Sequence, residues 1–440
     1  ETGVLQRLGA GEVVVPGDDG VLRSEELSID LIFLLSRGWL VRSGKGFRLA
    51  ENAHARQLCE LGPTPLPAGA SVLWQRAMMG EDVPELNLLD VDRISVSQAR
   101  SPGLWSATAW EVAIGYRLVP LIVALRSVSR EMDLACVPDV GRRILQAAGA
   151  GERVLQRGPG PFGIIEAYHP YMAQLPTVLR QGRGAVHVNR STNIAASQAA
   201  NAKTFSLAHD ALDRFCAETG FTYTVFIEHA LGRGEAVRQR LARGPQGLQF
   251  VGADLEDAAI DAAMASGDMP DGMVFVRNAD IGRPATLLAG MGELPTEGAV
   301  LMVGNGFHEV RGQTDAGMLQ VFAGYEAAGL LLLFTEESAL SVDDLLETAW
   351  NTYHAGFKYV HERSGQGLRP AVPALPSAME GPLPASWLEC ATRAGYVYAD
   401  QYCARSRTIY PTTPPSGHNP SISVTHFFVP GRIAARLGLE

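Results

Sequence analysis

The sequence lacks the features of a membrane protein, a disulfide-stabilised secreted protein and a nucleic-acid-binding protein. None of its apolar runs is as long as a bilayer span, and runs such as 121–125 and 330–334 have the length of strands. Its five cysteines are far apart and include no CxxC pair, which favours reduced, mostly buried thiols over a disulfide framework or a zinc site. The net charge of −10 argues against non-specific binding to nucleic acid.

The start of the chain also lacks a recognisable targeting signal. No signal peptide is visible, so we expect a cytoplasmic protein. The chain begins at Glu1 without methionine, so we expect either a trimmed chain or a domain cut from a longer polypeptide. With 440 residues, 46% hydrophobic and 19% charged, it is long enough for two or three globular domains.

Residues 1–60 predict a small cap. Ser24 is a candidate N-cap, and Glu25 and Glu26 suit the first turn of the helix that would follow. Residues 38–49 then predict two short strands around a glycine-rich turn. This helix followed by a hairpin resembles the winged-helix caps of many small-molecule methyltransferases.

Residues 61–205 predict a mostly helical lid, which begins with a proline-rich linker. Its later loops are dense in polar aromatic and amide side chains, which suit either a substrate pocket or the satisfaction of loop backbone groups. The candidate pocket-lining residues are Tyr168, His169, Asn189 and Asn193.

Residues 206–440 predict a Rossmann-like α/β core, because strand-sized apolar stretches alternate with helical ones. The five expected strands are 222–228, 248–253, 272–277, 298–303 and 330–334. A helix at about 342–362 follows the fifth strand. A final strand pair, 396–403 and 421–429, predicts a mostly parallel sheet with an antiparallel edge.

The turn after the first expected strand is the central motif of the chain. Glu228 closes the strand, and Gly232 and Gly234 let the backbone approach a ligand at the start of a helix. Val237 stands where a dinucleotide-binding fingerprint has its third glycine. This pattern suits S-adenosylmethionine (SAM) better than NAD, because SAM has an ammonium group for a carboxylate and no pyrophosphate for the helix.

Acidic residues also follow the next two strands. Asp254 is placed to hydrogen-bond ribose hydroxyls. Asp280, followed by the apolar Ile281, suits the amino group and ring face of adenine. The candidate cofactor-binding residues are Glu228, Gly232, Gly234, Asp254, Leu255, Asp280, Ile281 and Asn305.

The loop after the fourth strand, GNGFHEVRGQTD at 304–315, gathers residues that ligate metals or transfer protons. His308 and Gln313 are five positions apart and would lie on different faces of an unbroken helix, but Gly312 between them allows both to converge. A neutral imidazole with oxygen ligands suits iron or manganese. Alternatively, His308 is a general base without a metal, caps a helix or packs on the cofactor.

Three of these motifs, EHALGRG, NADIG and GNGFHEVRGQTD, occur together with HVNRSTNIAASQAANAKTF upstream. The combination resembles the mononuclear-metal C-methyltransferase domains of polyketide synthase loading modules, of the apratoxin and gephyronic acid type, within the class I SAM-dependent methyltransferases. The resemblance covers most of the chain. It implies iron or manganese held by His308 and Gln313, and methylation of the α-carbon of a malonyl or methylmalonyl thioester on an acyl carrier protein. The metal would stabilise the enolate that attacks the methyl group.

The resemblance also implies neighbouring polyketide synthase domains as partners. From the net charge and the short apolar runs we expect neither a nucleic acid nor a membrane as a partner. Tyr168 and Asn193 join His308 as candidate catalytic residues, on the lid side of the pocket. Two other functions remain open. One is a metal-independent small-molecule O-methyltransferase with His308 as general base, and the other is a non-catalytic SAM-fold domain that serves assembly.

Overall fold

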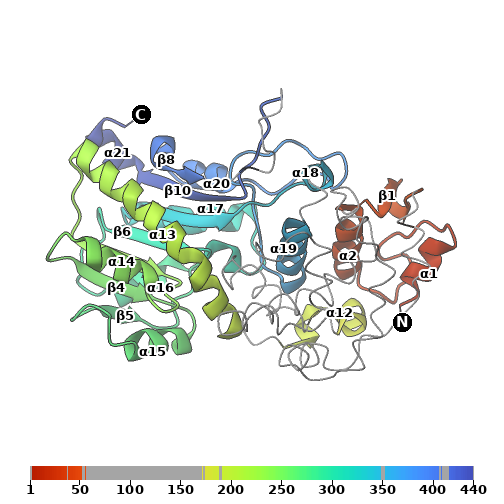
Figure 1. Ribbon diagram of the computed structural model, residues 1–440, viewed down its shortest axis with the longest axis horizontal. Helices are drawn as coiled ribbons and strands as arrows, with labels where there is room; N and C mark the ends of the chain where they lie inside the picture. The colour runs from red at the N-terminus through yellow and green to blue at the C-terminus, as the bar shows by residue number, and fades with distance from the viewer. Residues whose placement is uncertain are drawn as a thin grey trace, which may run out of the picture. The chain divides into compact units, whose positions relative to one another are not determined.

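The computed structural model divides into two compact units (Figure 1). Unit 1 comprises Glu1–Ala196, Ser341–Gly365 and Ser377–Glu380, and unit 2 comprises Ser197–Leu340, Gln366–Pro376 and Gly381–Glu440. The structure describes residues 2–36, 38–51, 55, 171, 174–187, 191–347, 352–405, 408 and 416–439, with the backbone alone at 191–201, 347 and 352–354. Most of the expected lid at 61–205 lies outside these residues.

Unit 1 contains the helix and hairpin expected near the N-terminus. Helix α2 (Ser24–Ser36) is followed by strands β1 (Leu40–Ser43) and β2 (Gly46–Leu49), which pair antiparallel. Leucines of α2 and Phe47 of β2 belong to one buried apolar cluster, so the hairpin packs on the helix. The other described elements of this unit are α1 (Val4–Gly9), α12 (Leu175–Gln181), η5 (Arg183–Ala185), α18 (Val342–Glu347) and α19 (Thr352–Ser364).

Buried ion pairs join α19 to α2 within unit 1. The guanidinium of Arg363, a residue 1% exposed, donates to Glu26 Oε2 at 2.7 Å and also binds Asp30. Arg183 donates to the other oxygen of Glu26 at 3.1 Å. A buried charge left without its partner is strongly destabilising, so these contacts fix the membership of α19 in this unit.

Unit 2 is built on an eight-stranded sheet with the order β5–β4–β3–β6–β7–β10–β8, and β9 pairs with β10. The strands are β3 (Val225–His229), β4 (Gln249–Ala253), β5 (Val274–Val276), β6 (Val300–Gly304), β7 (Leu331–Glu337), β8 (Tyr396–Tyr398), β9 (Ala404–Arg405) and β10 (Ser423–Pro430). Strands β3 to β7 are parallel, which confirms the five expected strands.

The final strand pair forms the antiparallel edge that we expected, with β10 as the inner strand and β8 as the outermost. Strand β10 runs antiparallel to both β7 and β8 and lies between them. Seven of its eight residues are buried, whereas β8 has three residues of which two are half-buried. A strand that is buried along its length suits an inner position, and a short one suits the edge.

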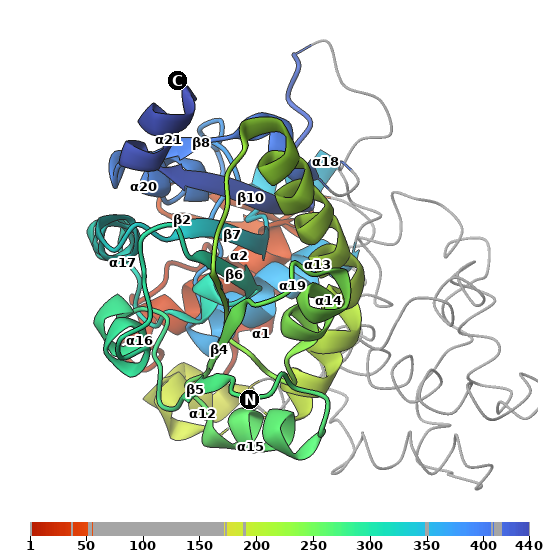
Figure 2. The ribbon, with the colours of Figure 1, turned by 90° about the vertical axis from the view of Figure 1, so that its left-hand side faces the viewer.

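Helices cover both faces of this sheet, as Figure 2 shows for α16 and α17 on one side and α13 and α14 on the other. One buried cluster joins the sheet to α16 (Pro284–Gly290), α17 (Asp315–Ala327) and α20 (Trp387–Arg393). A second joins the opposite face to α13 (Ser191–Thr219), α14 (Glu235–Arg243), α15 (Asp257–Ala265) and α21 (Gly431–Leu437). Two single-turn helices, η6 (Phe307–Glu309) and η7 (Asp400–Tyr402), complete the unit.

This strand order, with helices on both faces and one reversed strand, is a Rossmann-like class I methyltransferase fold. The carboxyl ends of β3, β4, β5 and β6 meet at one edge of the sheet, where ligands bind in open α/β sheets. Among the described residues, no helix combines the length and apolarity needed to cross a membrane. Cys216, Cys390 and Cys403 are free thiols.

Candidate active site

The turn after β3 runs through left-handed backbone conformations that favour glycine. Ala230, Gly232 and Gly234 have φ angles of 59°, 53° and 80°, a region that side chains with a Cβ rarely adopt. A Cβ on Gly234 would also lie 2.6 Å from the sulfur of Met269. The main chain that leads into α14 therefore carries no side chain at Gly232 and Gly234.

Glu228 lies inside the turn rather than on its surface. Its residue is 1% exposed, and its Oε2 accepts a 2.8 Å hydrogen bond from the main chain of Val237 in the first turn of α14. Burial raises the pKa of Glu228 to about 8, although main-chain donors of Val237 and Ala236 act in the opposite direction. Glu228 thus links the end of β3 to the start of α14.

Asp254, directly after β4, connects two of the strand ends. Its Oδ2 accepts from the main chain of Gly232 at 3.0 Å and its Oδ1 from Glu256 at 2.9 Å, while its own carbonyl accepts from Ala279 at 2.9 Å. Burial raises the pKa of its carboxyl group. The next side chain, Leu255, is 48% exposed. The structure thus brings the predicted residues Gly232, Asp254 and Leu255 together.

Two buried side chains bind the main chain of the loop after β5, which carries Asp280 and Ile281. His229 Nε2 lies 2.9 Å from the carbonyl of Ala279, and the Tyr325 hydroxyl donates to the carbonyl of Ile281 at 3.0 Å. Burial lowers the pKa of His229 to about 4, so its ring is neutral and Nε2 carries the donated proton. Nδ1 of the same ring faces the Tyr325 hydroxyl at 3.3 Å.

His308 stands in η6, just beyond the carboxyl end of β6. It is 7% exposed, and its Nδ1 lies 2.8 Å from Oε2 of Glu336 at the end of β7. Its Nε2 lies 3.6 Å from Oε1 of Glu309. Burial by itself would lower the pKa of His308, but the Glu336 and Glu309 carboxylates raise it to about 10.

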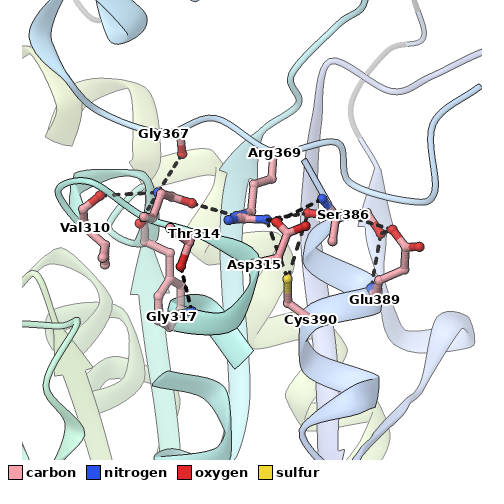
Figure 3. A network of polar contacts seen from close by, with 12 residues as sticks. Val310, Thr314, Asp315, Gly317, Gly367, Arg369, Ser386, Glu389 and Cys390 are labelled. Carbon is pink, nitrogen blue, oxygen red and sulfur yellow. Dashed lines mark hydrogen bonds and ion pairs between the residues drawn. The ribbon is translucent and has the colours of Figure 1, made fainter. Parts of the chain in front are cut away.

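Gln313 is held by a residue that the sequence did not single out. Its Oε1 accepts a 2.6 Å hydrogen bond from Nε of Arg369, and its Nε2 donates to the carbonyl of Gly367 at 2.9 Å. Figure 3 shows Arg369 and Gly367. The main chain of Gly367 in turn donates to the carbonyl of His308 at 3.0 Å. The two predicted metal ligands therefore meet at Gly367, through the side chain of Gln313 and the backbone of His308.

The donor set fits a metal ion only in part. Nδ1 of His308 contacts the Glu336 carboxylate, which leaves Nε2 as the ring nitrogen that would bind a metal. Histidine ligands commonly contact a carboxylate through their second nitrogen in this way. Gln313 already uses its Oε1 to accept from a guanidinium. Within the described ranges, no group of three or more His, Cys, Asp or Glu side chains is placed to hold a metal. Metal binding stays a prediction.

Backbone strain concentrates at the same edge of the sheet. In the part of the chain that the structure describes, the non-glycine residues with positive φ are Ala230, Asn278 and Asn305, at 59°, 53° and 52°. They follow β3, β5 and β6. Asn305, a predicted cofactor residue, donates its main-chain N–H to Thr335 at 2.8 Å. Such conformations gather at ligand sites, where surrounding contacts offset their cost.

Four predicted residues are not placed by their side chains. Tyr168 lies outside the described residues, as do His169 and Asn189, and Asn193 lies in α13 where only the backbone is described. Sequence reasoning also missed two residues. Glu336 stands two residues after the expected fifth strand, 330–334, and could have been found there as an acidic residue that follows a strand. Arg369 lies in a proline- and glycine-rich stretch that carries no such signal.

Comparison with known proteins gives similarities in fold. No protein-family model and no curated protein matches the sequence. The CurJ carbon methyltransferase is 12% identical, over 92% of this chain and 90% of its own, with a TM-score of 0.39. The citrinin polyketide synthase CMeT domain is 12% identical over 95% and 99%, with a TM-score of 0.41. The O-methyltransferase family 2 protein from Planctomyces limnophilus, in complex with apigenin, is 13% identical over 98% and 89%, with a TM-score of 0.36. Likenesses this low assign no activity to this chain.

Proposed function

We propose that this protein is a SAM-dependent methyltransferase. The observation that carries the proposal is the position of the His308–Glu336 pair at the same sheet edge as the glycine turn after β3. A ligand on that turn and a polar side chain at the next strand end would face each other across this edge. The sheet order supports the same conclusion, because it is the arrangement of class I methyltransferases.

The residues at the edge fit SAM. Each oxygen of Asp254 accepts one main-chain hydrogen bond and keeps a lone pair for a ribose hydroxyl. The exposed Leu255 offers an apolar surface for adenine, and Asp280 stands in the adjoining loop. Glu228 would act through the turn that it holds, since its carboxyl group is buried against α14. SAM would supply an electrophilic methyl group.

The proposed acceptor is the α-carbon of a malonyl or methylmalonyl thioester on an acyl carrier protein. The motif resemblance around 304–315 supports it, and so does the fixed imidazole of His308. His308 would be one ligand of an iron or manganese ion, with Gln313 as the second. When bound, the metal would supply Lewis-acid polarisation of the dicarbonyl group. Glu336 would hold the imidazole in one orientation, with Nδ1 turned inward. Neighbouring polyketide synthase domains are the proposed partners.

The same pair of residues favours a second candidate, a metal-independent O-methyltransferase. With Nδ1 on Glu336, the opposite nitrogen of His308 is the one that would accept a proton from a substrate hydroxyl. The raised pKa of His308, about 10, means that Nε2 must first lose its own proton before it can act in this way. This arrangement needs no metal. A non-catalytic SAM-fold domain remains the third possibility.

One experiment separates these functions. The protein is incubated with malonyl-acyl carrier protein, SAM and iron or manganese, with and without a chelator, and the carrier protein is read by intact mass. We expect a gain of one or more methyl groups that the chelator abolishes and that His308→Ala lacks. In a parallel incubation with a phenol or alcohol in place of the carrier protein, methylation that survives chelation would support the O-methyltransferase. Failure to bind SAM in calorimetry, with the protein folded, would contradict both enzymes.

A further inference from the structure

A buried cation, Arg369, binds the loop that carries His308 through Gln313. Arg369 is 1% exposed and belongs to the stretch Gln366–Pro376 of unit 2. Its carbonyl accepts from the main chain of Ala339 at 3.0 Å, just after β7, so its backbone is anchored to the sheet. A buried guanidinium with an anchored backbone is a rigid donor, because its planar fork loses little freedom when it binds.

The guanidinium of Arg369 makes directed contacts on both sides (Figure 3). Nε donates to Gln313 Oε1 at 2.6 Å, and Nη1 donates to Asp315 Oδ1 at 2.5 Å and to the carbonyl of Ala385 at 2.8 Å. Gln313 ends the loop after η6, and Asp315 is the first residue of α17. One side chain therefore joins the loop after β6, the start of α17 and the chain that enters α20.

Gln313 transmits this constraint to His308. Its Nε2 donates to Gly367 at 2.9 Å and lies 3.4 Å from the carbonyls of Phe307 and Val310, which flank His308 in the chain. These carbonyls orient the nitrogen end of the amide, since an amide oxygen cannot bind a carbonyl, and Arg369 is the described donor that holds the oxygen end. The amide of Gln313 is thus held at its oxygen by Arg369 and at its nitrogen by carbonyls on either side of His308, so it joins Arg369 to η6.

Glu336 holds the opposite side of η6. Its Oε1 accepts from the main chain of Phe307 at 2.6 Å and of His308 at 3.3 Å, while Oε2 holds the ring. We propose that Arg369 is a positioning residue that, through Gln313, completes the fixation of His308 which Glu336 begins. This inference rests on the proposed function for its effect on turnover. Its structural part does not depend on the substrate.

The test compares Arg369→Lys with a matched control, Arg240→Lys. Lysine keeps the charge but cannot bind Gln313 and Asp315 with a planar fork. Arg240 is also buried, at 2% exposed, and pairs with Asp213 at 2.7 Å near the far end of α14. Asp315→Asn is a second variant, because Asp315 has a half-exposed side chain and the substitution opens no cavity. Thermal unfolding shows whether each variant folds.

The first readout is NMR of the protein with labelled histidine rings, where the His308 signals are assigned among the ten histidines by their loss in His308→Gln. We expect Arg369→Lys to shift the His308 signals, Asp315→Asn to shift them less, and Arg240→Lys to leave them in place. The second readout is kinetic. We expect kcat about 10- to 100-fold lower in Arg369→Lys with the dissociation constant of SAM unchanged.

Unchanged His308 signals in Arg369→Lys would overturn the proposal. If that variant does not fold, unchanged signals in Asp315→Asn would do so. Equal losses of kcat in the Arg369 and Arg240 variants would also overturn it, because a general loss of packing would then explain both. A wild-type protein that binds no SAM or methylates no acceptor contradicts the proposed function instead, and the NMR comparison then decides the role of Arg369 by itself.

Discussion

Nδ1 of His308 lies 2.8 Å from Oε2 of Glu336, and both residues are more than nine-tenths buried. The same carboxylate receives the main-chain N–H groups of Phe307 and His308. One acidic residue at the end of β7 thus fixes both the backbone and the ring of a residue that follows β6. A charged group that binds several donors in this way is energetically costly to replace.

Replacement of Glu336 by glutamine should lower turnover without weakening cofactor binding. Glutamine can accept from the main chain of η6, but it loses the negative charge that holds the imidazole. We expect kcat to fall about 10- to 100-fold, while calorimetry shows an unchanged affinity for SAM. The control is Glu297→Gln, which removes a carboxylate from an exposed ion pair with Arg432 and should have little effect. A normal kcat in the Glu336 variant would exclude this role.

Replacement of Tyr325 by phenylalanine should weaken SAM binding and leave kcat at saturating SAM nearly unchanged. The substitution removes the donor to the carbonyl of Ile281 and the partner of His229 Nδ1. An unsatisfied buried group costs about 1–3 kcal/mol, so the dissociation constant should rise by about fivefold or more. Titration calorimetry measures it. An unchanged affinity would show that the loop after β5 does not need this support.

Replacement of His426 by phenylalanine should stabilise the protein, and more so in acid. His426 is fully buried on β10, its ring 4.9 Å from that of Phe334, and neither ring nitrogen has a hydrogen-bond partner among the described residues. Burial lowers the pKa of His426 to about 3. The contribution of the neutral His426 ring to the free energy of unfolding is therefore fully present above the unfolded pKa of about 6.5. It is lost as the pH falls towards the folded pKa of about 3.

The size of this effect follows from the two pKa values. At about pH 5 the unfolded chain binds a proton that the folded chain does not, which adds roughly 2 kcal/mol to the gain of the phenylalanine variant. Denaturant unfolding at about pH 5 and about pH 8 measures the two gains. Equal gains at both values would show that His426 is not held neutral in the folded state.

Replacement of Glu228 by glutamine should change the dependence of stability on pH in the opposite sense. Burial raises the pKa of Glu228 from 4.5 to about 8. Because the folded pKa is raised, the contribution of Glu228 to the free energy of unfolding is fully present below about pH 4.5 and is lost as the pH rises towards 8. Glutamine does not titrate, so its free energy of unfolding should gain on the wild type by several kcal/mol over this range. Denaturant unfolding without SAM measures the difference, and a difference that is constant with pH would contradict the prediction.

The strands of unit 2 could be predicted from the sequence because their apolar runs are continuous. The ends were less clear where polar residues are buried. The fifth strand was expected to end at Phe334, but β7 continues to Glu337. Thr335 is paired with Thr425 of β10 through their hydroxyl groups at 2.7 Å, a contact across 90 residues that no local pattern contains.

The candidate site also contains some residues that could be predicted from local sequence patterns and others that could not. The acids and glycines after β3, β4 and β5 are readable, because they stand directly after strands that the sequence marks. The positions of Glu336 and Arg369 relative to His308 depend on how β7 and the stretch after residue 365 return to the loop after β6. Those contacts span 28 and more residues and are set by packing.

The route of the chain restricts how this protein can be divided into fragments. The main chain leaves unit 2 after Leu340, supplies α19 to unit 1 and returns at Gln366. A truncation at residue 206 would keep α19 but discard α2, and Arg363 would lose the carboxylates of Glu26 and Asp30 that neutralise it. An independently folding catalytic fragment would have to be made by deletion and religation, with Leu340 joined to Gln366 through a short linker, instead of by a single cut.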